Sequence, residues 1–177
     1  MRIIGGSVRG RKLTALPGDH TRPTLDKVRG AVFNVLFDVV DDVVLDLFGG
    51  SGAMALEALS RGAERAVIVE NDAGAFGVIR ENRERCSFED RAELRFGDFR
   101  RVLREGERFD LIFLDPPYKS GLLEEALKMI ADMDLLKPGG VIVAETSVEE
   151  EPLLPAENMR IDKVKQYGKT KISFIKS

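Results

Sequence analysis

The fold of this chain is decided by the stretch Phe109-Asp110-Leu111-Ile112-Phe113-Leu114-Asp115-Pro116-Pro117-Tyr118. Its apolar run from Leu111 to Leu114 is typical of a strand that is buried on both faces of a sheet. Proline lacks a backbone N–H and fixes φ, so the strand ends at Pro116. In an open α/β sheet, ligands bind at the carboxyl ends of the strands. We therefore expect Asp115 and Tyr118 to border a ligand site.

The groups in this loop suit one kind of ligand. The Asp115 carboxylate and the Pro116 carbonyl are both acceptors, so together they can hold the two hydrogens of an exocyclic amine. The Tyr118 ring can stack on the heterocycle that carries this amine. The pattern predicts a site for a nucleobase amine. The alternative is a proline-rich turn with a surface tyrosine, but a specified four-residue string arises by chance in roughly one chain in a thousand of this length.

The composition is that of one globular domain. The chain has 177 residues, of which 44% are hydrophobic and 32% charged, enough to bury a sizeable core. The sequence contains no apolar run long enough to span a membrane, and residues 1–6 do not resemble a signal peptide, so we expect a cytoplasmic protein. The single Cys86 predicts a buried thiol. With one cysteine and one histidine, His20, we expect no zinc or other metal site.

Charge is unevenly distributed along the chain. Residues 1–30 contain seven basic and two acidic side chains, and because the whole chain has a net charge of −3, residues 31–177 carry −8. A basic segment on an acidic body indicates that the segment faces a polyanion, although short basic stretches are often merely solvated. Glycines 5, 6 and 10 suggest a short pair of strands with Arg9, Arg11 and Lys12 on the exposed side.

A helix follows this basic segment. Thr24 is a suitable N-cap, and apolar residues then recur at helical spacing to about Phe37. This helix can cover one edge of the core. It would also place Arg22, Lys27 and Arg29 along the mouth of the predicted site.

Alternating strands and helices begin at Val43. The segment Val43–Phe48 predicts a buried strand, Gly49–Gly52 a tight turn, and Ala53–Arg61 a helix. The next strand, Ala66–Val69, ends at Glu70, where an acidic residue can bind a ribose diol. These features favour a nucleoside-containing cofactor, and the spacing Gly50-x-Gly52-x-x-Ala55 by itself also fits a dinucleotide.

The second half of the chain continues the pattern. We expect a helix over Ala73–Cys86, a strand over Ala92–Phe96, a helix after Gly121, a turn at Lys137–Gly140 and a strand at Val141–Glu145. Met159–Gln166 and Thr170–Ile175 predict an antiparallel hairpin around Gly168. Asp98, after the third strand, has two equally supported interpretations: it accepts from an adenine amine beside Phe99, or it is the N-cap of the following helix.

The order of these features resembles the Rossmann-like methyltransferases that use S-adenosylmethionine on a nucleobase amine. More narrowly, the chain resembles the RsmD family of 16S rRNA (guanine(966)-N(2))-methyltransferases over essentially its whole length. The motifs that carry this narrower resemblance are Arg2-Ile3-Ile4-Gly5-Gly6, Arg9-Gly10-Arg11-Lys12-Leu13, Thr21-Arg22-Pro23-Thr24-x-Asp26-Lys27-Val28-Arg29 and Phe33-Asn34-Val35-Leu36. One departure is Gly49, which stands where the family pattern leads us to expect alanine or cysteine.

The resemblance implies an α/β, class I methyltransferase fold. It has a seven-stranded, mostly parallel sheet, helices on both faces and a C-terminal antiparallel hairpin. It also implies two regions: residues 1–24 form a basic N-terminal β extension that faces RNA, and residues 25–177 form the S-adenosylmethionine-dependent methyltransferase domain.

The resemblance also assigns site residues. The cofactor-binding set is Asp46, Phe48, Gly49, Gly50, Ser51, Gly52, Glu70, Asn71, Asp98 and Phe99. The catalytic set, which would hold the target guanine, is Asp115, Pro116, Pro117 and Tyr118. The set that would bind substrate RNA is Arg9, Arg11, Lys12, Arg22, Lys27 and Arg29.

The implied activity is methyl transfer from S-adenosylmethionine to the N2 amine of a guanine in 16S rRNA, with S-adenosylhomocysteine as product. The implied partner is 16S rRNA within the small ribosomal subunit or its assembly intermediate, and we expect a monomer. The choice of guanine rests on the resemblance, since Asp115 can accept from the amine of another base.

Four other functions compete with this one. A DNA adenine-N6 or cytosine-N4 methyltransferase shares the Asp-Pro-Pro-Tyr motif but generally needs a target-recognition domain. A protein-glutamine methyltransferase would carry asparagine in place of Asp115. An NAD-dependent oxidoreductase explains only the glycine turn. A non-catalytic RNA-binding assembly factor would not need the predicted catalytic residues, Asp115 to Tyr118, which are all present.

Overall fold

The computed structural model describes residues 1–17 and 22–177, so His20, the single histidine, lies outside the described residues. The helices are α1 (Arg22–Leu36), α2 (Ala53–Ser60), α3 (Ala73–Cys86), α4 (Phe99–Val102) and α5 (Leu122–Asp132). The strands are β1 (Val43–Asp46), β2 (Arg65–Glu70), β3 (Ala92–Phe96), β4 (Phe109–Leu114), β5 (Leu136–Ser147), β6 (Arg160–Tyr167) and β7 (Thr170–Lys176). None of the described helices is long and apolar enough to cross a membrane.

The seven strands form one sheet in the order β3-β2-β1-β4-β5-β7-β6. Strands β1 to β5 pair in parallel, whereas β7 is antiparallel to both β5 and β6. The predicted α/β architecture, with its C-terminal antiparallel hairpin, is therefore confirmed. The strand order reverses beside β1, and in open α/β sheets ligands bind at such a point, beyond the carboxyl ends of the strands.

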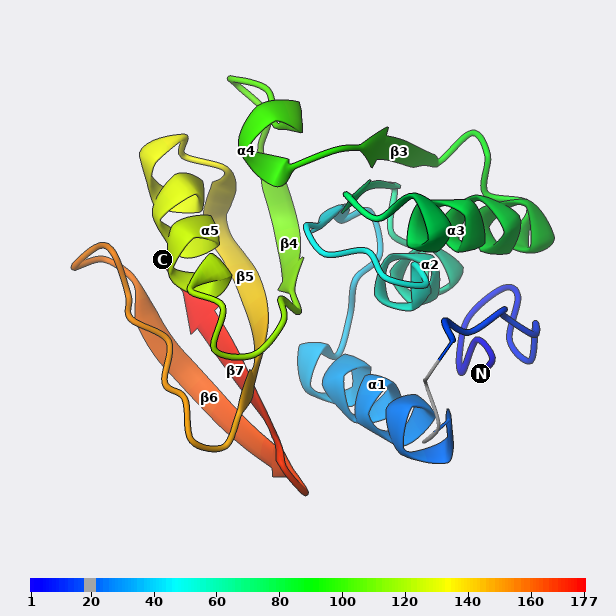
Figure 1. The fold of residues 1–177 in the computed structure, drawn as a ribbon, viewed down its shortest axis with the longest axis horizontal. Coiled ribbons are helices and arrows are strands. Elements are labelled where there is room, and N and C mark those ends of the chain that lie inside the picture. The colour runs from blue at the N-terminus through cyan, green and yellow to red at the C-terminus, as the bar shows by residue number, and fades with distance from the viewer. Residues whose placement is uncertain (18–21) are drawn as a thin grey trace.

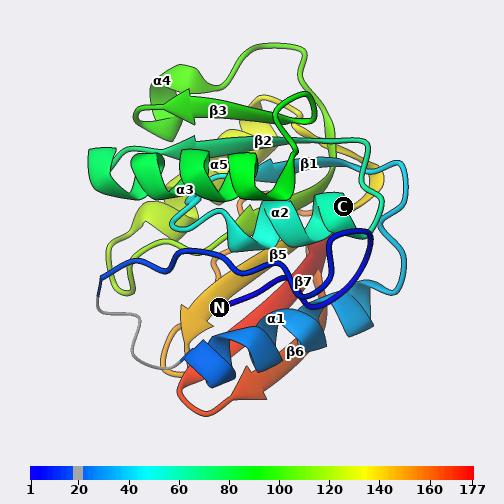
Figure 2. The same cartoon turned by 90° about the vertical axis from the view of Figure 1, so that its right-hand side faces the viewer.

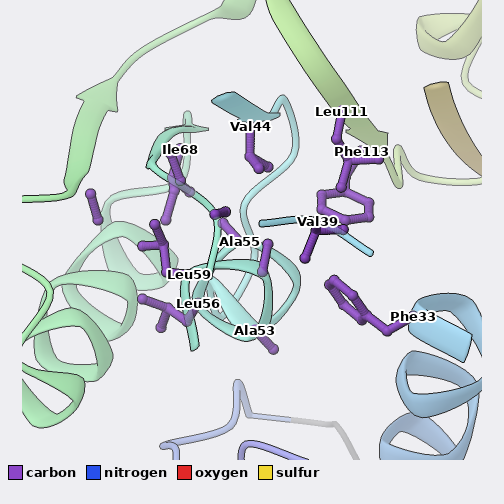
Figure 3. Close-up of a cluster of buried hydrophobic side chains, with 14 of the residues drawn as sticks. Phe33, Val39, Val44, Ala53, Ala55, Leu56, Leu59, Ile68, Leu111 and Phe113 are labelled. Carbon is purple, nitrogen blue, oxygen red and sulfur yellow. The ribbon is translucent and has the colours of Figure 1, made fainter. Parts of the chain in front are cut away.

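Helices cover both faces of the sheet (Figure 1). On one face, α1, α2 and α3 pack on a buried cluster that includes Phe33, Leu56 and Phe113, part of which Figure 3 shows. On the other face, α4 and α5 pack on a second cluster that includes Phe109 and Leu127. Successive strand residues point to opposite faces, so β4 needs an unbroken apolar sequence to fill both clusters.

The N-terminal segment packs against α2, where Figure 2 shows it crossing the molecule. Its two halves run antiparallel, but they form a single bridge, between Arg2 and Lys12, instead of the expected strands. Gly6 lies so close to α2 that a Cβ there would fall 1.8 Å from the Ser60 carbonyl oxygen, and its φ is +79°. Because the chain turns at Gly6 to pack on α2, the two halves of the segment do not pair as extended strands.

Two further local expectations were wrong. Helix α1 begins at Arg22, so Thr24 lies inside its first turn and is not its N-cap. The segment Lys137–Gly140 belongs to β5, with a register shift opposite β4 between Phe109 and Leu111, and does not form a separate turn. The buried thiol predicted at Cys86 is confirmed, with 1% of the residue exposed.

Candidate active site

Carboxylates gather where the parallel strands end. Asp46 ends β1, Glu70 ends β2, Asp98 follows β3 by two residues, and Asp115 follows β4 directly. Three cavities lie along this edge and share walls: Asp115 borders the first and second, and Glu70 borders the second and third. The predicted strand-end residues therefore lie along one continuous edge of the sheet.

The first cavity contains the most buried of these carboxylates. Asp46 is 3% exposed and lines this cavity together with Gly49, Gly50 and Ser51. Burial raises the pKa of Asp46 from 3.8 to about 7, although backbone N–H groups of Phe48 and Ala55 donate to the carboxylate and oppose this rise. A buried carboxylate of this kind favours a cationic ligand group, which would return its pKa toward the ordinary value.

The glycine turn after β1 is shaped by close contacts. Gly50 and Gly52 have φ of +54° and +77°, and Gly52 is the N-cap of α2 behind the cavity wall. A Cβ at Gly49 would fall 2.6 Å from the Ile68 side chain and 2.9 Å from that of Ile79. These isoleucines explain why glycine stands at position 49, where we expected alanine or cysteine.

Glu70 connects the end of β2 to the glycine turn. Its Oε2 accepts from the Gly50 N–H at 2.8 Å, and its Oε1 accepts from the N–H groups of Asn71 and Asp72, each at 2.8 Å. Glu70 and Asn71 line the second cavity with Leu16 and the Asp115–Tyr118 loop. The carboxylate is thus oriented by three backbone donors at the position where we expected a ribose to bind.

Asp98 lies at the third cavity with Phe99. Its Oδ1 accepts from the Arg100 N–H at 2.9 Å, so the interpretation of Asp98 as the N-cap of α4 is confirmed. The Phe99 ring contacts Phe48 edge-on, with centroids 5.4 Å apart. Asp98 thus both caps α4 and lines the third cavity. Its contact with an adenine amine stays a prediction.

The loop after β4 borders the second cavity along its whole length, from Asp115 to Tyr118. The Tyr118 side chain is 46% exposed, and its hydroxyl donates to Glu145 Oε1 at 2.9 Å and lies 3.3 Å from Thr170 Oγ1. Partial burial and the neighbouring carboxylate of Glu145 raise the pKa of Tyr118 to about 12. The hydroxyl contacts thus hold one end of the ring, and stacking of a base on it stays a prediction.

The predicted RNA-binding residues separate into two groups. Arg9, Arg11, Lys12 and Lys27 are exposed, and the side chain of Arg22 lies outside the described set. Arg29 differs from our expectation, because it is 4% exposed and its guanidinium donates to Glu57, Asp26 and the Arg2 carbonyl. This buried guanidinium holds the N-terminal segment through the Arg2 carbonyl and lines the first cavity, so it does not lie on the outer surface with the exposed cations.

Some residues at the site were not found from the sequence. Leu16 borders both the first and the second cavity, so the N-terminal segment forms part of the site. Asn82, fully buried on α3, donates to the carbonyl oxygens of Thr14 and Ser51, both at 2.9 Å, and joins this segment to the glycine turn. Glu145 also lines the first cavity. Its position after an apolar strand was the one available signal.

Comparisons with known proteins agree with this architecture. The chain is 36% identical to the putative rRNA methyltransferase YlbH of Bacillus subtilis, covering 99% of this chain and 98% of that protein. It is 37% identical to ribosomal RNA small subunit methyltransferase D of Escherichia coli, covering 88% and 80%. The solved structure of the putative methyltransferase yhhF from Escherichia coli superposes with a TM-score of 0.88 at 34% identity, covering 99% and 96%.

A family model described as conserved hypothetical protein 95 matches residues 1–176. The match includes both the N-terminal segment and the strand-end residues that line the cavities. Together with the relatives above, it shows that the chain belongs to this family, which is the RsmD family that its motifs resemble.

Proposed function

We propose that this protein transfers a methyl group from S-adenosylmethionine to the exocyclic N2 amine of a guanine in 16S rRNA of the small ribosomal subunit. The observation that carries the proposal is the shared wall at Asp115. This residue borders both the cavity that contains Asp46 and the glycine turn and the cavity that contains Glu70 and Tyr118. A cofactor and a base amine can therefore meet beside one carboxylate.

The residues present fit S-adenosylmethionine. Asp46 would hold the methionine ammonium, since its buried carboxylate with a raised pKa is stabilised by a nearby cation. The glycine turn lets the backbone approach the ligand. Glu70 and Asn71 would bind the ribose, and Asp98 with Phe99 the adenine. When bound, this cofactor supplies an electrophilic methyl group on a positively charged sulfur.

Asp115 and Pro116 would prepare the guanine amine. The N2 lone pair is delocalised into the ring, which makes this nitrogen a poor nucleophile. Acceptance of both N2 hydrogens by the Asp115 carboxylate and the Pro116 carbonyl draws the nitrogen toward tetrahedral geometry and localises the lone pair. Alignment of two bound reactants supplies roughly 7–11 kcal/mol of barrier reduction. The methylated nitrogen would be cationic and would lose one of its two protons easily, so no strong base is required.

The RNA would be held by phosphate contacts outside the cavities and by stacking of the target base on Tyr118. Arg9, Arg11, Lys12 and Lys27 are exposed cations on the N-terminal segment and on α1, where they suit phosphates. The target base must leave its stack to enter a pocket, and stacking on Tyr118 at about 1–3 kcal/mol offsets part of that cost. Relatives whose names specify ribosomal RNA support this substrate class.

The test is transfer of labelled methyl from S-adenosylmethionine to small ribosomal subunits from cells that lack this protein, with naked rRNA and duplex DNA in parallel. Nucleoside analysis should find N2-methylguanosine in the ribosomal samples alone. Label in N6-methyladenine, or label in DNA, would overturn the proposed substrate.

A further inference from the structure

Glu145 lines the first cavity and also lies beside the proposed catalytic loop from Pro116 to Tyr118. It is half-buried near the carboxyl end of β5. The cavity that it lines also contains Asp46 and Asp115. Three strands that are neighbours in the sheet, β1, β4 and β5, thus each contribute one carboxylate to the same cavity.

The sheet register fixes how these carboxylates are ordered. Asp46 pairs with Phe113 of β4, and Leu114 of β4 pairs with Ala144 of β5. The ladder ends at this pair, and the residues that follow it on the two chains are Asp115 and Glu145, both of which line the first cavity. Glu145 therefore lies one strand beyond Asp115, on the side away from Asp46.

This order matches the order of donors on the proposed ligands. If Asp46 holds the methionine ammonium and Asp115 holds the N2 amine, the next donor along the edge of guanine is the N1–H. Adenine presents an unprotonated N1 there, which is an acceptor and repels a carboxylate. A carboxylate one strand beyond Asp115 is thus a group that accepts from guanine and rejects adenine.

The side chain is held in place for such a contact. Tyr118 donates to Glu145 Oε1 at 2.9 Å, and the Thr170 hydroxyl also stabilises the carboxylate. A carboxylate has about four lone-pair positions, so these hydroxyls leave capacity for a ligand donor. Val143 and Ile172 form apolar walls of the same cavity, suited to the face of a flat ring.

We infer that Glu145 determines base specificity by accepting the N1–H of the target guanine, an inference that rests on the proposed function. A second explanation is that Glu145 only anchors the Tyr118 ring. The two explanations differ for Glu145→Gln. Glutamine keeps an oxygen that accepts from Tyr118, but its amide donates toward the base, which penalises guanine and favours a base with an acceptor at N1.

The experiment uses small subunits reconstituted with 16S rRNA in which the guanosine methylated by the wild-type protein is replaced by 2-aminopurine. This base keeps the N2 amine but has an unprotonated N1. Guanine and 2-aminopurine subunits compete in one reaction, and mass spectrometry of the two N2-methylated nucleosides gives the ratio of their kcat/KM values. Such a ratio does not depend on how much of a variant is folded.

Wild-type protein should prefer guanine by at least about tenfold, as expected for one base-edge contact. Glu145→Gln should lower that ratio by at least about tenfold. Tyr118→Phe is the matched control, because it removes the bond to Glu145 and leaves the carboxylate, so its ratio should stay near that of the wild type. Comparing ratios between variants cancels the effect of the missing 6-oxygen of 2-aminopurine.

Two results would overturn the inference: a wild-type protein that methylates both bases equally well, or a Glu145→Gln variant with the wild-type ratio. The first of these needs no variant, so a Glu145→Gln protein without activity does not prevent the test. Failure of the proposed function looks different, because the wild-type protein would then place no methyl group on guanine N2 in unmodified subunits.

Discussion

Glu57 on α2 and Arg29 on α1 form a buried ion pair, with Arg29 Nε 3.3 Å from Glu57 Oε2. Neither side chain is more than 4% exposed. The same carboxylate accepts from the N–H groups of Ile4 and Gly5, each at 2.8 Å. One buried side chain thus holds two helices and the N-terminal segment together.

Replacing Glu57 by glutamine should destabilise the protein by up to about 3–5 kcal/mol, because Arg29 would lose its fully buried partner and keep only the more exposed carboxylate of Asp26. Urea unfolding measures this difference. The control is Asp132→Asn, which removes an exposed carboxylate paired with Lys128 on α5 and should change stability far less. Equal stability of the two variants would show that the buried pair contributes nothing beyond a surface pair.

Asp46→Asn should weaken cofactor binding and should stabilise the folded protein at pH 8. The pKa of Asp46 rises from 3.8 to about 7 on folding, so between these values the folded protein retains a proton that the unfolded chain has released. Stability due to this group therefore falls as pH rises from about 4 to about 7. Asparagine does not ionise, so the variant avoids this loss of stability. The loss is on the order of 4 kcal/mol, because each unit of pKa shift corresponds to about 1.36 kcal/mol.

Urea unfolding of the ligand-free protein at pH 4 and pH 8 tests this prediction. The variant should be more stable than the wild type at pH 8 and should have no such advantage at pH 4. Calorimetric titration with S-adenosylmethionine at pH 8 should show weaker binding, because an amide does not neutralise an ammonium. An advantage that is the same at both pH values would mean that ionisation of Asp46 is not its cause.

Asp115→Ala should lower turnover by about 10²–10³-fold, the usual cost of removing one group that stabilises developing charge. Cofactor affinity should stay nearly intact, because the groups assigned to the cofactor lie on other strands. Single-turnover methyl transfer and calorimetry measure the two quantities separately. Asp115→Asn keeps one acceptor oxygen and should be intermediate. Near-normal turnover of the alanine variant would remove Asp115 from the mechanism.

Tyr118 should act mainly through its ring. Tyr118→Phe loses the hydroxyl bond to Glu145, worth about 0.5–1.5 kcal/mol, and should lose turnover by at most about tenfold. Tyr118→Ala also loses stacking, worth about 1–3 kcal/mol for one base, and should be clearly slower. Steady-state kinetics on small subunits separates the two variants. If both behave alike, stacking is irrelevant and the hydroxyl explains the effect.

The exposed cations of the N-terminal segment should bind phosphates. Combined replacement of Arg9, Arg11 and Lys12 by alanine should weaken RNA binding and flatten its salt dependence by up to about three contacts. Binding measured between low and moderate salt gives this slope. As control, alanine at Arg104, Arg108 and Lys128 removes the same charge from α5 and from the segment before β4. Equal slopes for both triple variants would assign the effect to net charge alone.

Sequence reasoning located the strand-end residues because parallel strands place their carboxyl ends on one edge, whatever the details of packing. It could not locate Glu57 or Asn82, whose partners outside their own helices lie 28 to 68 residues earlier in the chain. Glu145 was visible as an acidic residue after an apolar run, but its neighbours depend on the register of β5 with β4 and β7. Thr24 had the chemistry of an N-cap, yet α1 begins two residues before it.

The N-terminal segment carries Arg9, Arg11 and Lys12 on its outer side and the cavity wall at Leu16 on its inner side. Only a few residues separate the two, and the Asn82 amide holds the chain between them at Thr14. If RNA and cofactor each bind one side, a shift of the segment that improves one contact and also improves the other couples the two ligands. Thermodynamic linkage then requires reciprocity: the factor by which cofactor raises RNA affinity equals the factor by which RNA raises cofactor affinity. The segment would make the enzyme release spent cofactor more readily once its RNA has departed.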